Sequence, residues 1–169
     1  MMAVHELGHV FGAAVTGATV ERVVLHPLTI SRTDVSPNPH PGVVVWLGPV
    51  IGCLLPMAAI ALVPPRLTVL SKMARFIAGF CLVANGAYIA FGSFDRVGDC
   101  GEMARTGTPA WIMFAFGIVA IPYGLFLWHG LGSIRRFFDN QALVTPRMTY
   151  SLLAALVAIV IAESILSSR

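Results

Sequence analysis

Charged residues are scarce in this sequence. Its 169 residues include 11 Lys and Arg and 8 Asp and Glu, so only 11% of the chain is charged, against about a quarter in soluble domains. Hydrophobic residues make up 57% of the chain, and its mean hydropathy is +0.82. This composition excludes an ordinary soluble globule, so we expect membrane lipids to surround most of the chain.

Paired cysteines and basic tracts are also missing. Cys53, Cys81 and Cys100 show no Cys-x-x-Cys spacing, and the first two lie in apolar runs, where a thiol usually acts as a small hydrophobic group. The basic residues are scattered, without the interleaved aromatic residues of a nucleic-acid surface. We therefore expect neither a redox function nor a nucleic-acid partner.

A cleavable signal peptide is absent as well. No charged segment, apolar stretch and small-residue cleavage site follow one another at the N-terminus. Only four residues precede His5, so a membrane helix that contains His5 would have almost no chain before it. One hypothesis is that the native chain starts earlier than this sequence does, which an intact-mass measurement would test.

Long uncharged runs fill much of the chain, and about 20 apolar residues suffice for a helix to cross a bilayer. Between residues 19 and 34, β-branched residues surround His26-Pro27, a pattern typical of a short hairpin. The sequence thus predicts one domain, 1–169, of an all-α membrane protein with about five transmembrane helices and a short β-hairpin between the first two. The expected helices span about 1–17, 43–63, 74–94, 109–131 and 148–166, with a polar loop at 95–105.

The distribution of cations predicts an orientation, because Lys and Arg favour the cytoplasmic side of a membrane. Two of the expected connections are rich in cations, whereas the other two pair their arginines with acids. We expect the N-terminus and the cationic connections on the cytoplasmic side of a multi-pass protein in a bacterial-type inner or cell membrane. The cations concerned are Arg66, Lys72 and Arg75, and Arg135, Arg136 and Arg147.

The run His5-Glu6-Leu7-Gly8-His9 carries the clearest chemistry. On a helix, His5 and His9 project from one face and can bind a single metal ion. Zinc lowers the pKa of a water molecule to about 7, and Glu6 can serve as the general base for that water. Each ionisable group inside a membrane costs about 2.5–3.5 kcal/mol, so three together indicate a function. The alternative is a polar cluster wetted by lipid headgroups.

A third protein ligand is needed, because catalytic zinc normally has three. The acidic segment 94–102 supplies the candidates. Asp99 is preferred, since Gly98 and Gly101 give it the flexible backbone that close approach to a metal favours. Asp95 is the runner-up, and Glu102 is a candidate for orienting a histidine. The alternative is a solvated loop in which these acids pair with neighbouring arginines.

The combined pattern resembles the site-2 protease family of intramembrane zinc metallopeptidases. The shared features are the histidine–glutamate motif on a membrane helix, a β-rich stretch, a helix that carries Leu47-Gly48-Pro49 and a later Gly98-Asp99 loop. The resemblance covers about the first 105 residues and is nearest to a minimal branch without PDZ or CBS domains.

This resemblance implies an enzyme and its cofactor. By position, His5, His9 and Asp99 would hold Zn²⁺ and Glu6 would activate water. Asn85 would match the family asparagine that helps to position substrate. The implied activity is that of a membrane-embedded metalloendopeptidase, which cleaves a transmembrane protein or peptide substrate in or near its membrane segment.

Other interpretations stay open at this point. A catalytically inactive binding or scaffold protein could keep the same fold, whereas a metal carrier would need more ligands along a pathway. Gly8 and Gly12 lie four residues apart and permit close helix packing, so a homo-oligomer that pairs through them is a further hypothesis. His129 and Glu163 lie near helix ends, where we expect them to reach water.

Overall fold

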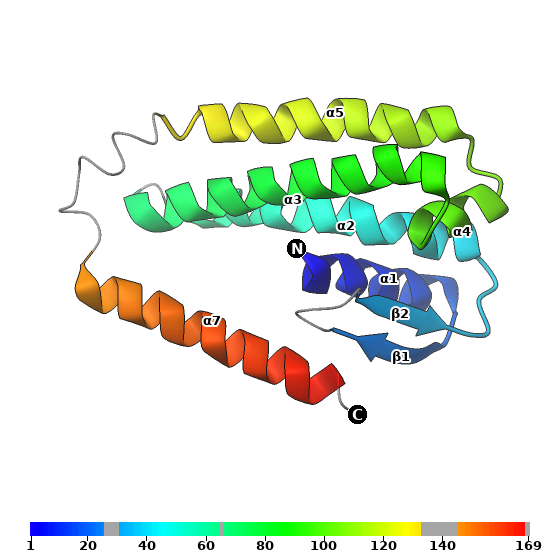
Figure 1. The fold of residues 1–169 in the computed structure, drawn as a ribbon, viewed down its shortest axis with the longest axis horizontal. Coiled ribbons are helices and arrows are strands. Elements are labelled where there is room, and N and C mark those ends of the chain that lie inside the picture. Colours follow the sequence, from blue (N-terminus) through cyan, green and yellow to red (C-terminus); the bar gives the residue numbers. More distant parts are fainter. Residues whose placement is uncertain (26–30, 65, 133–144, 168–169) are drawn as a thin grey trace.

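The computed structural model describes residues 1–25, 31–64, 66–132 and 145–167, most of them helical. Two short strands pair between the first and second helices (Figure 1). The expected helical protein with a small antiparallel sheet is therefore confirmed. In chain order the elements are α1 (Met2–Thr16), β1 (Val20–Val24), β2 (Arg32–Val35), α2 (Pro41–Leu62), α3 (Thr68–Asp95), α4 (Asp99–Arg105), α5 (Ala110–His129) and α7 (Pro146–Ser167).

Three helices of the described chain are long and apolar enough to cross a membrane: α2, α3 and α5, with mean hydropathies of 2.2, 1.6 and 2.0. Helix α1 has 15 residues, which at 1.5 Å per residue gives about 22 Å, less than the roughly 30 Å of a bilayer core. The apolar helix Thr149–Ile165, within α7, is also shorter than these three spans. The described chain thus has three candidate spans, which is consistent with a membrane protein.

The hairpin is antiparallel, with Val20 opposite Val35 and Val23 opposite Thr33. The register shifts between Val20 and Arg22, and such a bulge twists the strand locally. Both strands contact α1, so the sheet lies over the helix that carries the histidine motif (Figure 1). His26-Pro27 lies outside the described residues.

Two of the expected boundaries need correction. Helix α3 begins at Thr68 rather than at about 74, so Lys72 and Arg75 lie in its first turns. Long cationic side chains allow this, because they can keep their charge at a membrane surface while their stems cover apolar atoms.

The second correction concerns 95–105, which we expected to be a loop. Asp99–Arg105 forms the short helix α4, with Asp99 and Glu102 in its first turn and Arg105 in its last. Acids at the N-terminal end and a cation at the C-terminal end both stabilise a helix through its dipole. Seven residues are too few for a hydrophobic period to reveal such a helix in the sequence.

Helices α2 and α3 lie at the centre, with α1 packed on α2 and α5 packed on α3 (Figure 1). Gly8 and Gly12 face α2: an added Cβ at Gly8 would overlap the Leu47 carbonyl, and one at Gly12 would lie 3.0 Å from Val44 Cα. The glycine face that could have paired two chains is therefore occupied by a helix of the same chain.

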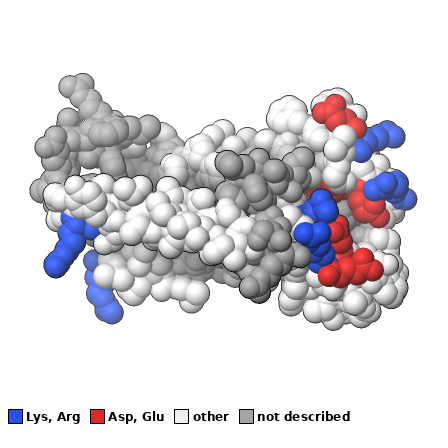
Figure 2. Space-filling model, turned by 60° about the horizontal axis from the view of Figure 1, so that its bottom comes forward, with Lys and Arg blue, Asp and Glu red and all other residues white. Residues whose placement is uncertain are grey.

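Charge differs between the two ends of the described chain. Acidic and basic side chains gather at one end of the face in Figure 2, whereas only basic side chains are visible at the other end. The mixed end holds the hairpin and α4, and the cationic end holds the start of α3 (Figure 1), which follows Arg66 in the sequence. Arg135 and Arg136 of the other expected cationic connection lie outside the described residues.

Candidate metal centre

Helix α1 presents its two histidines from one buried face. The His5 and His9 residues are 4% and 6% exposed, and their ring centroids are 4.9 Å apart. Asp99, at the start of α4, reaches both rings. Its Oδ2 lies 2.7 Å from His5 Nε2 and 3.4 Å from His9 Nε2. His5 and Asp99 are 94 residues apart in the sequence. The fold thus brings distant parts of the chain together at one point.

The donor set fits a small divalent cation. The three ligand atoms lie within 4.8 Å of one another. Zinc binds such atoms at about 2.0–2.2 Å, which places neighbouring donors of a tetrahedral site about 3.3 Å apart. The His9 to Asp99 distance of 3.4 Å matches this spacing, and the His5 to Asp99 distance of 2.7 Å is shorter. Atoms that all carry lone pairs approach this closely only around a positive charge, which is either a proton or a metal ion.

Helix α2 orients His9. Its Nδ1 lies 2.9 Å from the Val44 carbonyl oxygen, which can only accept a hydrogen bond, so Nδ1 carries the proton and donates. Nε2 therefore faces Asp99 and can bind a metal through its lone pair. Gly48 provides space for the ring, because a Cβ at this position would overlap the His9 imidazole.

Glu6 lies beside the histidines and is 3% exposed. The hydroxyl of Thr33 on β2 donates a hydrogen bond of 2.8 Å to its Oε2. The hairpin thereby holds the carboxylate that the motif offers as a general base. Among the described residues, every buried side-chain nitrogen and oxygen has a hydrogen-bond partner, so this polar cluster is fully satisfied within the protein.

Asp99 is fixed by its own backbone. Its N–H donates to the Tyr88 hydroxyl oxygen at 3.1 Å, and Gly98 before it has a φ of 60° and a ψ of −135°, a conformation that glycine adopts readily. Burial alone would raise the pKa of the Asp99 carboxyl, but the hydrogen bonds and charges of His5 and His9 outweigh it and hold this pKa well below its usual range. Asp99 is therefore an anion, as a metal ligand must be.

The other candidate acids lie elsewhere. Asp95, the runner-up, ends α3 with an exposed side chain and is not part of the cluster. Glu102, which we expected to orient a histidine, instead accepts a hydrogen bond of 2.6 Å from Arg105. His129 is exposed at the end of α5. The arginine pairing expected for an ordinary loop thus applies to Glu102 and not to Asp99.

Asn85 is completely buried, and its Oδ1 lies 2.7 Å from His5 Nδ1. Its proposed role in positioning substrate stays a prediction. Sequence patterns did not reveal Thr33, Tyr88 or the Val44 carbonyl as neighbours of the site. None of them belongs to a spaced motif, and a backbone carbonyl has no signature in the sequence.

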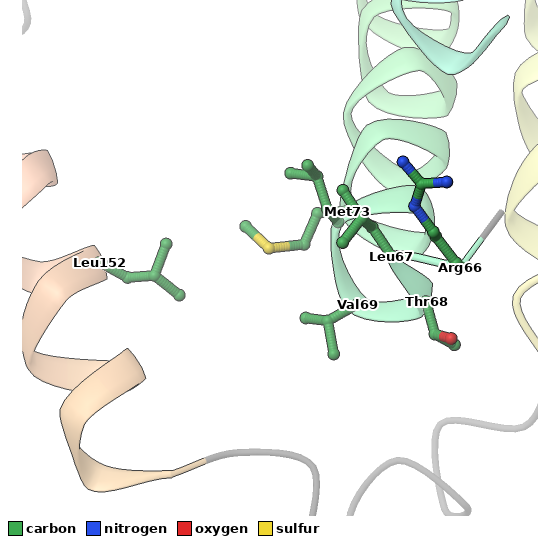
Figure 3. Close-up of a pocket in the computed structure, with 7 residues that line it drawn as sticks. Arg66, Leu67, Thr68, Val69, Met73 and Leu152 are labelled. Carbon is green, nitrogen blue, oxygen red and sulfur yellow. The ribbon is translucent and has the colours of Figure 1, made fainter. Parts of the chain in front are cut away.

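An open groove lies at the cationic end, between the start of α3 and α7 (Figure 3). Its lining is mostly apolar and offers no histidine, cysteine or carboxylate, so this groove lacks the chemistry of the histidine cluster. It is formed by Arg66, Leu67, Thr68, Val69, Leu70, Met73 and Leu152.

Comparison of the chain with protein-family models, with curated proteins and with solved structures finds no match. A function must therefore be inferred from the chemistry of the chain's own residues. Within the described residues, His5, His9 and Asp99 form the one group of metal-ligating side chains close enough to share an ion.

Proposed function

We propose that this protein is a membrane-embedded, zinc-dependent endopeptidase of the site-2 protease type that hydrolyses peptide bonds in or near transmembrane segments. The observation that carries the proposal is the meeting of His5 and His9 with Asp99 in a buried cluster beside Glu6. Two imidazoles and a carboxylate are a ligand set typical of catalytic zinc. A buried carboxylate next to such a set is what general base catalysis at a metal requires.

Each polar residue has a defined task in this reaction. His5, His9 and Asp99 would hold the ion, which when bound polarises the scissile carbonyl and acidifies water. Glu6 takes a proton from the attacking water as the new C–O bond forms. It then delivers that proton to the amine nitrogen as the C–N bond breaks. The hydrogen bond from Thr33 keeps the Glu6 carboxylate in place during both transfers.

The position of the site along the helices supports access for water and substrate. Asp99 follows the end of the α3 span after only three residues of connection. It begins α4, which lies at the end of the molecule where acidic and basic side chains gather (Figures 1 and 2). Water can therefore reach the cluster from a membrane surface. A substrate must unwind locally, because a stable helix keeps its carbonyls in internal hydrogen bonds.

We place α1 and α7 in the membrane with the three candidate spans, which gives a five-helix, multi-pass protein of a bacterial-type inner or cell membrane. The cationic end, with Arg66, Lys72 and Arg75, faces the cytoplasm in this arrangement because cations are retained there. The active site then lies toward the opposite surface. Accessibility of cysteines introduced into the α2–α3 turn and the hairpin of the full chain would test this orientation.

Cleavage of a reconstituted transmembrane peptide in single-turnover conditions tests the catalytic proposal. Glu6→Gln keeps the shape of the side chain and removes the base, so the rate should fall about 10²–10⁴-fold. Zinc content should stay near one ion per chain, because Glu6 is not a ligand. Equal cleavage by the wild type and Glu6→Gln would disprove catalysis by Glu6.

Metal analysis of the purified chain separates an enzyme from an inactive scaffold. We expect the wild type to retain zinc and the double variant His5→Ala/His9→Ala to lose it. A wild-type chain without zinc, or zinc that is retained after both substitutions, would favour a protein that keeps this fold without catalysis.

A further inference from the structure

Asn85 occupies an unusual place for an amide. It lies in the middle of α3, one of the candidate spans, and it is 0% exposed. A polar side chain inside a membrane segment is costly unless it is paired. Both polar atoms of Asn85 are paired: Nδ2 donates to the Cys81 carbonyl oxygen at 2.8 Å, and Oδ1 lies 2.7 Å from His5 Nδ1.

These two contacts fix the orientation of the amide and the proton position on His5. The Cys81 carbonyl can only accept, so the amide nitrogen must face it and the amide oxygen must face His5. An oxygen acceptor requires the proton on Nδ1 of His5. The lone pair of the ring, or its second proton, is then on Nε2, the atom that faces Asp99.

Helix α2 leaves room for this arrangement. A Cβ on Gly52 would lie 2.9 Å from Asn85 Nδ2 and 3.1 Å from Oδ1. Both distances are shorter than ordinary van der Waals contact, so any larger residue at position 52 would push the amide out of its place. The His5 orientation thus depends on residues of two helices other than its own.

We infer that Asn85 is a positioning residue for His5: it keeps the proton on Nδ1 and aims Nε2 at the shared site with Asp99, and Gly52 provides the space that this requires. The zinc ion whose binding this orientation would strengthen is that of the proposed function, on which this part of the inference rests. The hydrogen bond between Asn85 and His5 is present without a metal. His9 has no equivalent side-chain partner among the described residues, since a backbone carbonyl orients it. His5 is therefore the ligand whose hydrogen-bond acceptor can be removed by substituting one side chain.

Asn85→Leu in the full chain, purified in detergent, is the direct test. Leucine has a similar size and cannot accept a hydrogen bond. Ser93→Ala is the matched control, because it removes another buried polar group of α3 that bonds only to a backbone carbonyl, that of Ala90. We expect Asn85→Leu to weaken zinc binding about 10–100-fold in a chelator competition, and Ser93→Ala to change it less than twofold.

A double-mutant comparison separates positioning from a general structural effect. In a His5→Ala background, Asn85→Leu should change zinc affinity less than twofold, because its target is gone. An equal loss in both backgrounds, or no loss in either, would overturn the inference. If Asn85→Leu fails to fold, Gly52→Ala takes its place in the same comparison with the same expected loss.

A second measurement does not depend on the metal. In ¹⁵N-histidine-labelled protein, the Nδ1-bound proton of His5 should be visible and slow to exchange, and it should disappear or exchange rapidly in Asn85→Leu. A slow Nδ1 proton that survives the substitution would contradict the inference. If the wild type bound no zinc, the proposed endopeptidase would fail, but this proton would still decide whether Asn85 orients His5.

Discussion

Two helix contacts in this molecule use glycine in different ways. On α2, Gly48 and Gly52 make room for polar side chains of α1 and α3: the His9 ring lies over Gly48 and the Asn85 amide over Gly52. Where α3 meets α5, Gly79 and Gly124 make room for the backbone of each other's helix, and Gly79 also for the Trp128 ring. A Cβ on Gly79 would lie 2.9 Å from the Gly124 carbonyl oxygen, and one on Gly124 would lie 2.7 Å from that of Gly79.

The difference separates function from stability within one small protein. Close backbone approach between membrane helices gains van der Waals contact and is a common way to hold them together. A glycine beneath an imidazole or an amide contributes little such contact between backbones. Its value lies in the position of the side chain above it. We therefore expect glycine substitutions at the two contacts to affect different properties.

The largest effect is expected for Gly48→Ala. The new methyl group would overlap the His9 ring, and the ring must leave Asp99 to avoid it. Zinc affinity should fall by about 100-fold or more, beyond the usual loss on removing a partner that only orients a ligand. Chelator competition measures this loss, and peptide cleavage should fall with it.

Gly42→Ala is the matched control on the same helix, because a Cβ there would make only ordinary contact, 3.5 Å from Thr106 Cβ. It should bind zinc as the wild type does. If Gly48→Ala bound zinc normally, the His9 ring would not depend on the space above Gly48. The proposed difference between glycines under the site's side chains and glycines between α3 and α5 would then be wrong.

Gly124→Ala should show the opposite pattern. The methyl group would lie 2.7 Å from the Gly79 carbonyl oxygen and 2.8 Å from Val83 Cγ2, so the helices must separate. Overpacking of this kind costs about 1–3 kcal/mol, seen as a lower midpoint of thermal unfolding in detergent. Zinc affinity of the folded protein should stay within about twofold of the wild type, since α5 supplies no ligand. A tenfold loss of affinity with an unchanged midpoint would reverse the assignment.

The sequence predicted the features that have a local pattern of their own: apolar runs, the spacing of two histidines on a helix, and glycines next to an acid. Uncharged runs located the spans, and the separation of His5 from His9 placed both rings on one helix face. Asp99 was preferred over Asp95 because of its flanking glycines, and Asp99 is the acid that meets both histidines.

Contacts between distant elements were beyond such patterns. Asn85 and His5 are 80 residues apart, and Thr33 and Glu6 are 27 apart, so only the packing of helices and hairpin brings each pair together. Periodicity describes the face of one element and not its neighbour. Helix α4 was missed for a related reason: its seven residues are too few to show a period, although Cys100 and Met103 are buried in a cluster with Ile89 of α3 and residues of α2 and α5.

The smallest effect is expected for Thr33→Val, which extends the comparison to the hairpin. Valine keeps the β-branched shape that suits a strand and removes the hydroxyl that donates to Glu6 Oε2. A hydrogen bond contributes about 1 kcal/mol net, and somewhat more when it is made to a charged group, so the rate of peptide cleavage should fall about tenfold while zinc affinity stays unchanged. Thr16→Val, which removes a hydroxyl bonded only to backbone carbonyls of α1, should leave both properties near wild type. If Thr33→Val weakened zinc binding as strongly as cleavage, the hairpin would hold the metal ligands rather than the base, and the division between ligand-orienting helices and a base-orienting strand would be wrong.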